Sequence, residues 1–553
     1  MARRWIGPAL ALTLVACVYA GKIAHPFQWD DFHFIVGNDF AHDPANVGAF
    51  FTTGQDNLYR PLRALVYLAL HAVAGGSAVP YHLAGIAFHL LTCLLVIAIA
   101  GRMLGDRRLG LLAGTLFGVH PVVVDRVANI TGSLDIPGVT LALLAFLFYL
   151  RAKEGNYRAF LAASLASFAL ALLYSEEAMT LAPLVLVFAR ADAPEDRPGP
   201  WRVALRAALP YLAVLAGYLV VRTLALRAVA RSPMPLDQHA ALLLAMGVVF
   251  WGYVFRLLFP VYLSPAYGLT PADVDVAAAA VAVVLIALVV LAAFVLLRRR
   301  SGVGLGLAWF LVALLPFSNL VPIGEVMADR YAYHAAAGFA VAFVGFLAAT
   351  AGLDRRRTRA ALGVLLAAFC VLSLARVRVW SSPLALWGDA VAHAPRSYVA
   401  RINHGIALRD ADPDGARAEF EAAVAIDPAR PIAHVNLGQL LLERRDFGGA
   451  ARAFLRALQH DPEHVPALAG LANVAVVGGD DARARALARK ALAIDGGNVS
   501  VHNVLAFLAY RDGRFDEAAR EYEFVARNAA DPRLAEGARQ NLERLRSRGA
   551  GRP

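Results

Sequence analysis

The chain has 553 residues, of which 59% are hydrophobic and 17% are charged, and its mean hydropathy is +0.55. This composition excludes a single ordinary soluble domain and a disordered protein. The formal net charge is +11. Much of the arginine lies in short loops between apolar runs, which is the positive-inside pattern of membrane proteins, so the basic charge does not indicate a nucleic-acid partner.

The apolar residues are concentrated in the first two thirds of the chain. Residues 5–380 form a series of long apolar runs, whereas residues 395–553 have the composition of a soluble protein. About 20 apolar residues are needed to cross the hydrocarbon of a bilayer. The expected spans lie near 5–22, 82–101, 109–123, 136–151, 159–174, 178–190, 207–228, 239–260, 276–297, 303–322, 335–352 and 360–376.

The number and direction of these spans follow from the loops. The N-terminal run could be a cleaved signal peptide ending near Ala20, but the many later spans favour a retained first helix with a cytoplasmic N-terminus. The arginine-rich loops near 200 and 298 are both expected on the cytoplasmic side, so the chain must cross the membrane an even number of times between them. Three apolar runs lie there, so at least one segment does not cross as expected. We therefore expect 11 to 13 spans. The shorter run 61–74 carries charge and is expected to form an interfacial helix.

The C-terminal part repeats with a period of 34 residues. One register holds small residues (Ala416, Ala450, Ala484, Ala518), a second holds mostly large ones (Phe420, Phe454, Ala488, Tyr522), and a third holds Ala423, Ala457, Ala491 and Val525. A helix–turn–helix unit of this length is the tetratricopeptide signature, and such units stack into an α-solenoid that binds proteins in its groove. The predicted organisation is a membrane domain over 1–380, a linker over 381–396, about four repeats over 397–546 and a tail over 547–553.

Polar residues gather in the loops that the arginine pattern assigns to the non-cytoplasmic side. Asp30 and Asp31 follow the first span and are flanked by aromatic residues. A charge at membrane depth is costly, so each such cluster is a functional hypothesis. The other clusters contain His120, Asp125, Asn129, Glu177, Asp329, Arg330 and Tyr331.

These side chains suit chemistry on a phosphate-linked lipid. A carboxylate can deprotonate an acceptor hydroxyl, and an arginine fork can hold a phosphate, a role that Arg330 and Arg60 could take. The sequence has no glycine-rich phosphate loop, so a nucleotide donor is not expected. No metal site is expected from the residue spacing, although paired carboxylates could hold a divalent cation.

Taken in order, these motifs resemble the transmembrane and tetratricopeptide-repeat O-mannosyltransferases, which have the class C (GT-C) glycosyltransferase fold. The motifs are Trp29-Asp30-Asp31, Tyr59-Arg60-Pro61-Leu62, Tyr81-His82-Leu83, His120-Pro121, Val127-Ala128-Asn129-Ile130, Ser175-Glu176-Glu177, Asn319-Leu320-Val321-Pro322 and Asp329-Arg330-Tyr331.

The resemblance implies a polyprenyl- or dolichyl-phosphate sugar donor, usually mannose, and places the catalytic acidic residue at Asp30 or Asp31. Asp125 and Asp329 stand where the family usually has Glu, and Glu176 stands where it usually has Lys. The last difference replaces a positive charge with a negative one.

We therefore expect an all-α enzyme of a bacterial inner membrane, with periplasmic repeats that bind a protein acceptor. Its expected reaction moves a sugar, with mannose as the expected one, from a polyprenyl-phosphate donor to a protein hydroxyl. The lipid-phosphate sugar is a co-substrate, and a divalent cation is the one further cofactor that the carboxylates leave open. The alternatives are a non-catalytic membrane-anchored scaffold, a transporter of lipid-linked sugars, or a transferase whose acceptor is a glycan or a lipid.

Overall fold

The computed structural model describes residues 3–55, 58–193, 199–226, 236–270, 273–352, 355–529 and 532–549. Within these ranges the chain is helical and forms no β-sheet, as predicted, with a lone bridge between Gln55 and Leu58. The chain divides into two compact units, Met1–Ala394 and Pro395–Pro553.

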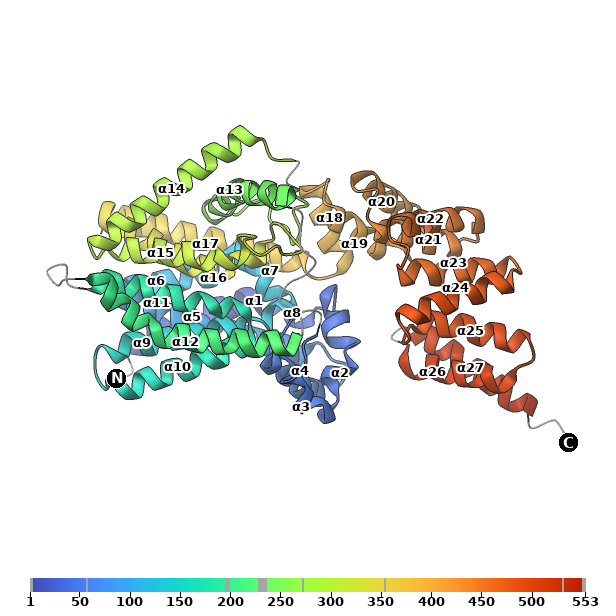
Figure 1. The fold of residues 1–553 in the computed structure, drawn as a ribbon. Coiled ribbons are helices and arrows are strands. Elements are labelled where there is room, and N and C mark those ends of the chain that lie inside the picture. Colours follow the sequence, from blue (N-terminus) through green and yellow to red (C-terminus); the bar gives the residue numbers. More distant parts are fainter. Residues whose placement is uncertain are drawn as a thin grey trace. The chain divides into compact units, whose positions relative to one another are not determined.

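The first unit is a bundle of long apolar helices (Figure 1). Among the described residues nine helices are long and apolar enough to cross a membrane, or ten if the bent pair Arg107–Gly118 and Pro121–Ala128 is one span. The long helices are α1 (Arg3–Tyr19, continued by Ala20–Ala24), α5 (Val79–Met103), α9 (Ile136–Ala152), α10 (Tyr157–Tyr174), α12 (Pro200–Leu226), α13 (Leu236–Leu258), α14 (Val276–Arg298), α16 (Tyr333–Thr350) and α17 (Arg356–Val379).

Two of the expected spans are shorter than predicted. Helix α11 (Leu181–Asp192) has 12 residues and is preceded by a 3-10 turn over Glu176–Thr180. Helix α15 (Gly302–Leu314) has 13 residues and is followed by a 3-10 turn over Leu315–Phe317. By helix length the described part of the chain therefore falls below the expected 11 to 13 spans. Both helices still pack inside the bundle, with α11 against α12 and α15 against α16.

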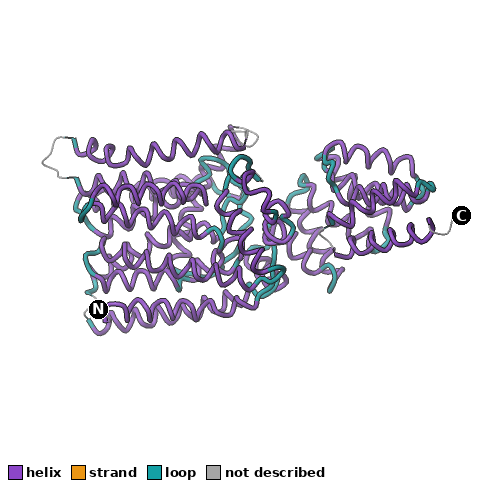
Figure 2. Tube along the Cα trace, turned by 90° about the horizontal axis from the view of Figure 1, so that it is seen from below, coloured by secondary structure: helices purple, strands orange, loops and turns teal. Residues whose placement is uncertain are grey.

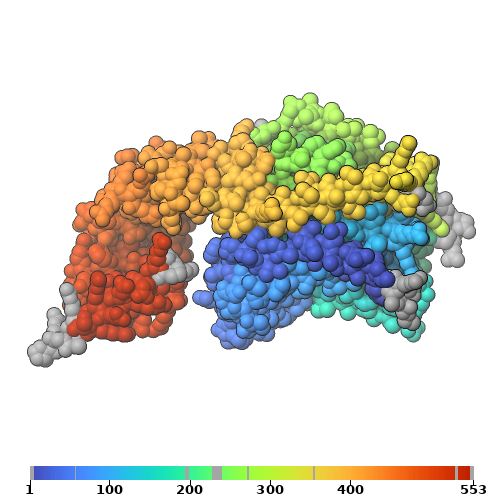
Figure 3. Space-filling view, turned by 180° about the vertical axis from the view of Figure 1, so that it is seen from behind, coloured from blue at the N-terminus to red at the C-terminus, as the bar shows by residue number. Residues whose placement is uncertain are grey.

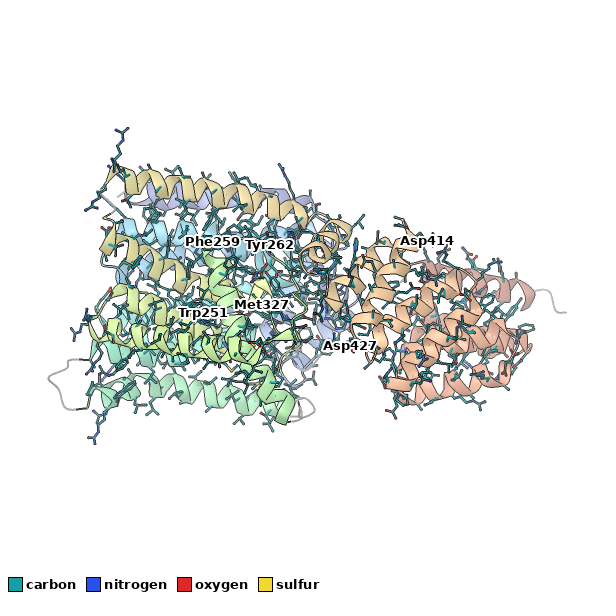
Figure 4. All side chains as sticks on the ribbon, turned by 90° about the horizontal axis from the view of Figure 1, so that it is seen from above. Trp251, Phe259, Tyr262, Met327, Asp414 and Asp427 are labelled. Carbon is teal, nitrogen blue, oxygen red and sulfur yellow. The ribbon has the colours of Figure 1, made fainter. Side chains whose placement is uncertain are left out.

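The path of helix α13 explains why three apolar runs, an odd number, lie between the arginine-rich loops near 200 and 298. Near its start, His239 Nε2 lies 3.0 Å from the Asn319 carbonyl, and near its end, the Leu257 carbonyl lies 2.9 Å from His120 Nε2. Both partners belong to connections at the same end of the bundle. Helix α13 therefore begins and ends there, and Figure 4 labels Trp251 in its second half.

The arginine-rich loops meet at the opposite end of the bundle. Arg102 pairs with Glu154 at 3.2 Å, Lys153 pairs with Asp192 at 2.5 Å, and Arg300 donates to the Asp192 carbonyl. Figure 2 shows that most of the loop segments of this unit lie at the other end of the helices. The predicted grouping of loops into two sets is thus present in the structure.

Glycine allows the closest helix contacts in the bundle. A Cβ at Gly306 of α15 would lie 2.4 Å from the Ala342 backbone nitrogen of α16, and one at Gly338 would lie 2.4 Å from that of Phe310. Small residues at such crossings let helix backbones approach, which drives helix association in lipid. Helix α1 packs against α17, so the first and last long helices of the unit are neighbours (Figure 3).

Short elements cover the loop-rich end. After α1 the chain forms a helical turn over Phe32–Val36, then α2 (Asp39–His42), α3 (Val47–Phe50) and α4 (Pro61–Ala74). Helix α4 matches the predicted 61–74 segment in length and bounds. The connection between α6 (Arg107–Gly118) and α9 contains a 3-10 turn (Pro121–Val123), α7 (Val124–Ala128) and α8 (Ile130–Ser133).

The segment that the sequence analysis treated as a linker is a helix of the first unit. Helix α18 (Pro383–His393) follows α17 after a short turn and buries Leu386, Trp387 and Ala390. The ring of His393 lies 5.7 Å from that of Tyr262, which Figure 4 labels. The boundary between the units falls after Ala394.

The second unit consists of four helical hairpins and a final helix. They are α19 (Tyr398–Leu408) with α20 (Pro413–Ile426), α21 (Pro431–Glu443) with α22 (Phe447–His460), α23 (Val465–Val477) with α24 (Asp481–Ile494), α25 (Val499–Arg511) with α26 (Phe515–Asn528), and α27 (Pro532–Gly549). The predicted helix–turn–helix repeat is therefore confirmed.

The predicted registers form the core of this unit. The small residues of the first register are fully buried, and so are Phe420 and Phe454 of the second. A Cβ at Gly438 or Gly470 would lie within 3.0 Å of the Phe454 ring, so glycine makes room for that ring. Asp412, Asp446 and Asp480 cap the second helix of successive hairpins.

Candidate active site

The two adjacent carboxylates Asp30 and Asp31 have different environments. Asp31 is fully buried, and its Oδ1 accepts hydrogen bonds from the Thr131 backbone N–H at 2.9 Å and hydroxyl at 2.6 Å. Its Oδ2 accepts from the Gln28 backbone N–H at 3.1 Å. Asp30 is only partly buried, and within the described residues its carboxylate forms no hydrogen bond or ion pair. Asp31 therefore ties the loop to α8, while Asp30 is available to a substrate.

Burial raises the pKa of both carboxyl groups. For Asp31, burial raises the pKa to about 6, against the effect of its hydrogen bonds from Thr131 and Gln28. For Asp30, burial raises the pKa, and the nearby positive charge of Arg330 opposes that rise. A carboxylate of raised pKa is a better proton acceptor than an ordinary aspartate, provided that it is ionised at the working pH.

Arg330 lies beside Asp30 on a stack of aromatic rings. Its guanidinium carbon is 5.0 Å from the Trp29 ring centroid and 5.1 Å from that of Tyr331, and the Tyr331 ring stacks on Phe317 at 4.4 Å. Its Nη1 donates to the Pro265 carbonyl at 2.9 Å. Its backbone N–H donates to Asp125 Oδ2 at 3.0 Å. These contacts hold a positive charge next to the free carboxylate of Asp30.

Asp329 and Asp125 are the buried acidic neighbours of this pair. Asp329 Oδ1 accepts a hydrogen bond from the Tyr267 hydroxyl at 2.6 Å, and Arg256 Nε donates to the same hydroxyl oxygen at 2.7 Å. Within the described residues Asp329 Oδ2 and Asp125 Oδ1 have no hydrogen-bond partner, although both side chains are buried. Buried acceptors without a partner are costly, so these two oxygens are where a bound hydroxyl or water would be stabilised.

Arg60 belongs to a separate ion-pair network at the same end of the bundle. Its Nε donates to Glu176 Oε2 at 2.7 Å, and its Nη1 lies 3.0 Å from Asp135 Oδ2. Arg63 pairs with Asp135 at 3.0 Å. Two donor groups of Arg60 are thus occupied by carboxylates.

The network also explains the unusual charge at position 176. Arg222 Nε lies 4.0 Å from Glu176 Oε1, so Glu176 lies between two arginines. Glu177, from the predicted supporting set, accepts a short hydrogen bond from Arg126 instead. The negative charge of Glu176 is therefore balanced inside the protein.

Two of the predicted supporting residues, His120 and Asn129, form hydrogen bonds to backbone groups of the protein. His120 accepts from the Val122 backbone N–H through Nδ1 and contacts the Leu257 carbonyl through Nε2, and it is buried. Asn129 is the N-cap of α8 and accepts from the Gly132 backbone N–H. The structure thus brings Asp30, Asp125, Asp329, Arg330 and Tyr331 together and leaves His120, Asn129, Glu177 and Arg60 outside that group.

Several residues of this end were not singled out from the sequence. Arg222 and Arg256 lie inside apolar runs. An isolated arginine in such a run is a functional-site hypothesis by itself, so the sequence held a signal for both residues. Lys22 is fully buried and donates a short hydrogen bond to the Val127 carbonyl. Trp387 lies in the segment taken for a linker. Among the residues that the structure describes, no group of three or more His, Cys, Asp or Glu side chains could hold a metal ion.

An apolar cavity of about 410 Å³ opens between α13, α14 and α15. Ile286, Val290 and Leu311 line it, and so do Phe317 and Ser318. Phe317 stacks on Tyr331, and the Tyr331 ring in turn contacts the guanidinium of Arg330. The cavity wall and Arg330 are therefore linked through the Tyr331 ring.

Together these features define a multi-spanning integral membrane protein with a polar site at one end of its bundle and a tetratricopeptide solenoid after it. Residues 60–226 match the family described as dolichyl-phosphate-mannose-protein mannosyltransferase, and residues 406–458 and 435–499 match the tetratricopeptide repeat. The chain therefore combines a segment that matches a mannosyltransferase family with tetratricopeptide repeats, as the resemblance predicted.

Curated relatives are similar to this chain over short segments. Protein O-mannosyl-transferase Tmtc1 of Drosophila melanogaster is 32% identical over 117 residues, which are 21% of this chain and 13% of the relative. Protein O-mannosyl-transferase TMTC2 of Homo sapiens is 31% identical over 99 residues, 18% of this chain and 12% of the relative. TMTC3 of Mus musculus is 25% identical over 154 residues, 26% of this chain and 17% of the relative. The matches therefore span less than a fifth of the relatives' length.

Solved structures also match. A tetratricopeptide protein of Thermus thermophilus, TTC0263, is 20% identical, covers 34% of this chain and 95% of its own, and has a TM-score of 0.27. The crystal structure of MamA is 18% identical, covers 26% of this chain and 85% of its own, and has a TM-score of 0.23.

Proposed function

We propose that this protein is a membrane glycosyltransferase that moves a sugar, most simply mannose, from a polyprenyl-phosphate donor to a hydroxyl group of a protein. The observation that carries the proposal is that Asp30, whose carboxylate forms no hydrogen bond or ion pair within the described residues, lies near the guanidinium of Arg330 at the loop-rich end of the bundle. The match of residues 60–226 to a mannosyltransferase family supports the choice of sugar.

The proposed reaction is an inverting displacement at the anomeric carbon. Asp30 accepts the proton of the acceptor hydroxyl as its oxygen forms a bond to that carbon. The bond between the anomeric carbon and the phosphate oxygen breaks, and polyprenyl phosphate leaves with the electron pair. Arg330 stabilises the charge that develops on the leaving phosphate. Asp125 and Asp329, each with a buried oxygen that has no partner among the described residues, accept hydrogen bonds from sugar hydroxyls.

The apolar cavity between α13, α14 and α15 supports a lipid-linked donor. A phosphate held by Arg330 would place an attached isoprenoid chain beside Phe317, which lines this cavity. Arg60 contributes in this proposal by fixing α4 against Asp135 and Glu176, and any contact to the phosphate would use its remaining Nη2.

The repeats support a protein acceptor, because tetratricopeptide grooves bind extended peptides. In this proposal the protein lies in a bacterial inner membrane, with Asp30, Arg330 and the repeats on the periplasmic side. The scaffold alternative requires that Asp30 and Arg330 be replaceable without loss of function. A glycan or lipid acceptor would leave the membrane site unchanged and make the repeats dispensable for transfer.

The test is transfer of labelled mannose from polyprenyl-phosphate mannose by the purified full chain in detergent. Envelope protein, glycan and lipid fractions serve as separate acceptors. We expect label in the protein fraction with the wild type, and a strongly reduced rate of labelling with Arg330→Ala. The matched control is Arg158→Ala, an exposed arginine at the opposite end of the bundle, which should keep full activity. Equal activity of the two variants, or no transfer with any donor sugar, would contradict the proposal.

A further inference from the structure

Helix α18 contacts the residue that precedes the proposed base. The ring of Trp387 meets the ring of Trp29 edge to face, with the centroids 5.1 Å apart and an angle of 87° between the planes. Trp387 is 2% exposed. The Trp29 ring also lies 5.0 Å from the Arg330 guanidinium carbon, so one indole contacts both α18 and the proposed phosphate-binding group.

Trp29 has a backbone conformation that a bulky residue seldom adopts. Its φ is +50°, in the left-handed region that favours glycine. Such a conformation persists only where surrounding contacts impose it, and it often occurs at functional sites. Because Asp30 is the next residue, the backbone at Trp29 determines the direction in which the Asp30 side chain leaves the loop.

Further contacts hold the same loop against the end of α17. Gln28 Nε2 donates to the Trp380 carbonyl at 2.9 Å, and Trp380 is fully buried. Arg376 of α17 pairs with Asp389 of α18, which fixes the helix that carries Trp387. The loop before Asp30 is therefore held by elements more than 350 residues later in the chain.

We infer that Trp387 is a positioning residue of this site: it holds the Trp29 ring in place, so that Arg330 and Asp30 keep their relative geometry. The inference rests on the proposed function and adds α18 to the machinery of the reaction. An aromatic edge-to-face pair and a cation over a ring face are both directional contacts, so removing the first loosens the second.

The experiment compares three full-length variants. Trp387→Ala removes the ring, and we expect its kcat to fall roughly 10- to 100-fold, the effect of a displacement of about 1 Å at a reacting centre. Trp387→Phe keeps an aromatic edge and should restore most of the turnover. Leu386→Ala removes the neighbouring buried side chain of the same helix, which is 0% exposed but has no ring. It should keep its kcat even if it lowers thermal stability.

A pH profile separates positioning from general destabilisation. The charged groups that act on the Asp30 carboxyl are Arg330, His33, Asp125 and Asp135. If the guanidinium of Arg330 moves away in Trp387→Ala, the pKa of Asp30 rises, because the largest opposing positive charge is lost. The acid limb of kcat/KM should therefore move to higher pH in Trp387→Ala and stay in place in Leu386→Ala.

The binding affinity for polyprenyl phosphate, measured without a sugar donor, tests the positioning role of Trp387 independently of the proposed reaction. If the wild type transfers no sugar, the proposed function fails, and the binding comparison then decides the positioning role. Weaker binding by Trp387→Ala but not by Leu386→Ala supports that role. Equal effects of the two variants on kcat, on the pH limb or on binding would overturn it, and so would absence of binding by the wild type.

Discussion

The guanidinium carbon of Arg330 lies 5.0 Å from the ring centroid of Trp29, the residue immediately before Asp30. This contact joins two segments that are about 300 positions apart in the chain. It holds a guanidinium next to Asp30, whose carboxylate forms no hydrogen bond or ion pair in the described part of the chain. The proposed chemistry depends on that arrangement, and so do most of the predictions below.

The first prediction concerns the pH dependence of transfer. Asp30 must be ionised to accept a proton, so kcat/KM should fall about tenfold per pH unit below its pKa. Burial raises that pKa and the charge of Arg330 lowers it. Arg330→Gln should therefore move the acid limb to higher pH, whereas Arg330→Lys, which keeps the charge, should leave it near the wild-type position. An identical limb in Arg330→Gln would show that Asp30 is not the titrating base.

The second prediction concerns the ion-pair network around Asp135. Asp135→Asn leaves Arg60 and Arg63 without their shared carboxylate, and breaking a buried pair in this way costs about 3 kcal/mol. We expect a clearly lower unfolding temperature in detergent. The exposed pair of Arg102 and Glu154 is the control, and Glu154→Gln should change stability by less than about 1 kcal/mol. Similar unfolding temperatures for the two variants would contradict a structural role for the network.

The third prediction concerns the apolar cavity. If it holds the isoprenoid chain of the donor, the wild type should prefer long-chain donors to short ones. Ile286→Trp or Leu311→Trp should fill the cavity and abolish that preference, without loss of turnover of a short-chain donor. The control is Val281→Trp on α14, whose side chain is 59% exposed and does not line the cavity. A chain-length preference that survives in the filled variants would place the donor chain elsewhere.

The fourth prediction concerns the core of the repeats. Phe454 is fully buried between Gly438 and Gly470, so Phe454→Ala leaves a cavity and should cost about 3 to 5 kcal/mol. Phe447, on the same helix, is 37% exposed, and Phe447→Ala should cost far less. Chemical denaturation followed by circular dichroism measures both. Equal losses would show that the 34-residue registers do not form the core.

The sequence was sufficient to predict the repeats because their signal is local and redundant. Ala416, Phe420 and Ala423 recur at a constant spacing, and each position of the pattern is buried in the structure. The apolar runs likewise predicted the long helices of the bundle, since about 20 residues are needed for each crossing.

Helix lengths and the path of α13 were harder to predict. The run 178–190 reads as a span, yet its first residues form a 3-10 turn before α11. Hydropathy measures how apolar a segment is and carries no information on its direction, so α13 could not be recognised as a helix that returns to the same end.

The site was predicted as a set of residues and not as an arrangement. Sequence patterns could not separate Asp30 from Asp31, because the difference arises from hydrogen bonds to Thr131, which is 100 positions away. The same limit applies to Trp387, whose contact with Trp29 depends on how α18 folds back onto the bundle. Long-range pairs of this kind carry no periodic signal in a single sequence.

The most direct test of the account compares Asp30→Asn, Asp31→Asn and Asp39→Asn in the transfer assay, with thermal stability measured in parallel. Asp39 is an exposed carboxylate of the same loop-rich segment after α1 and serves as the control. We expect Asp30→Asn to fold normally and lose transfer by about two to four orders of magnitude, as for a missing general base. Asp31→Asn should lower the unfolding temperature. The carboxylate of Asp31 accepts three hydrogen bonds, and in the variant an amide NH2 group would face at least one of these donors instead of an acceptor oxygen. Asp39→Asn should behave as the wild type. Full transfer by Asp30→Asn would contradict the central claim that Asp30 is the base.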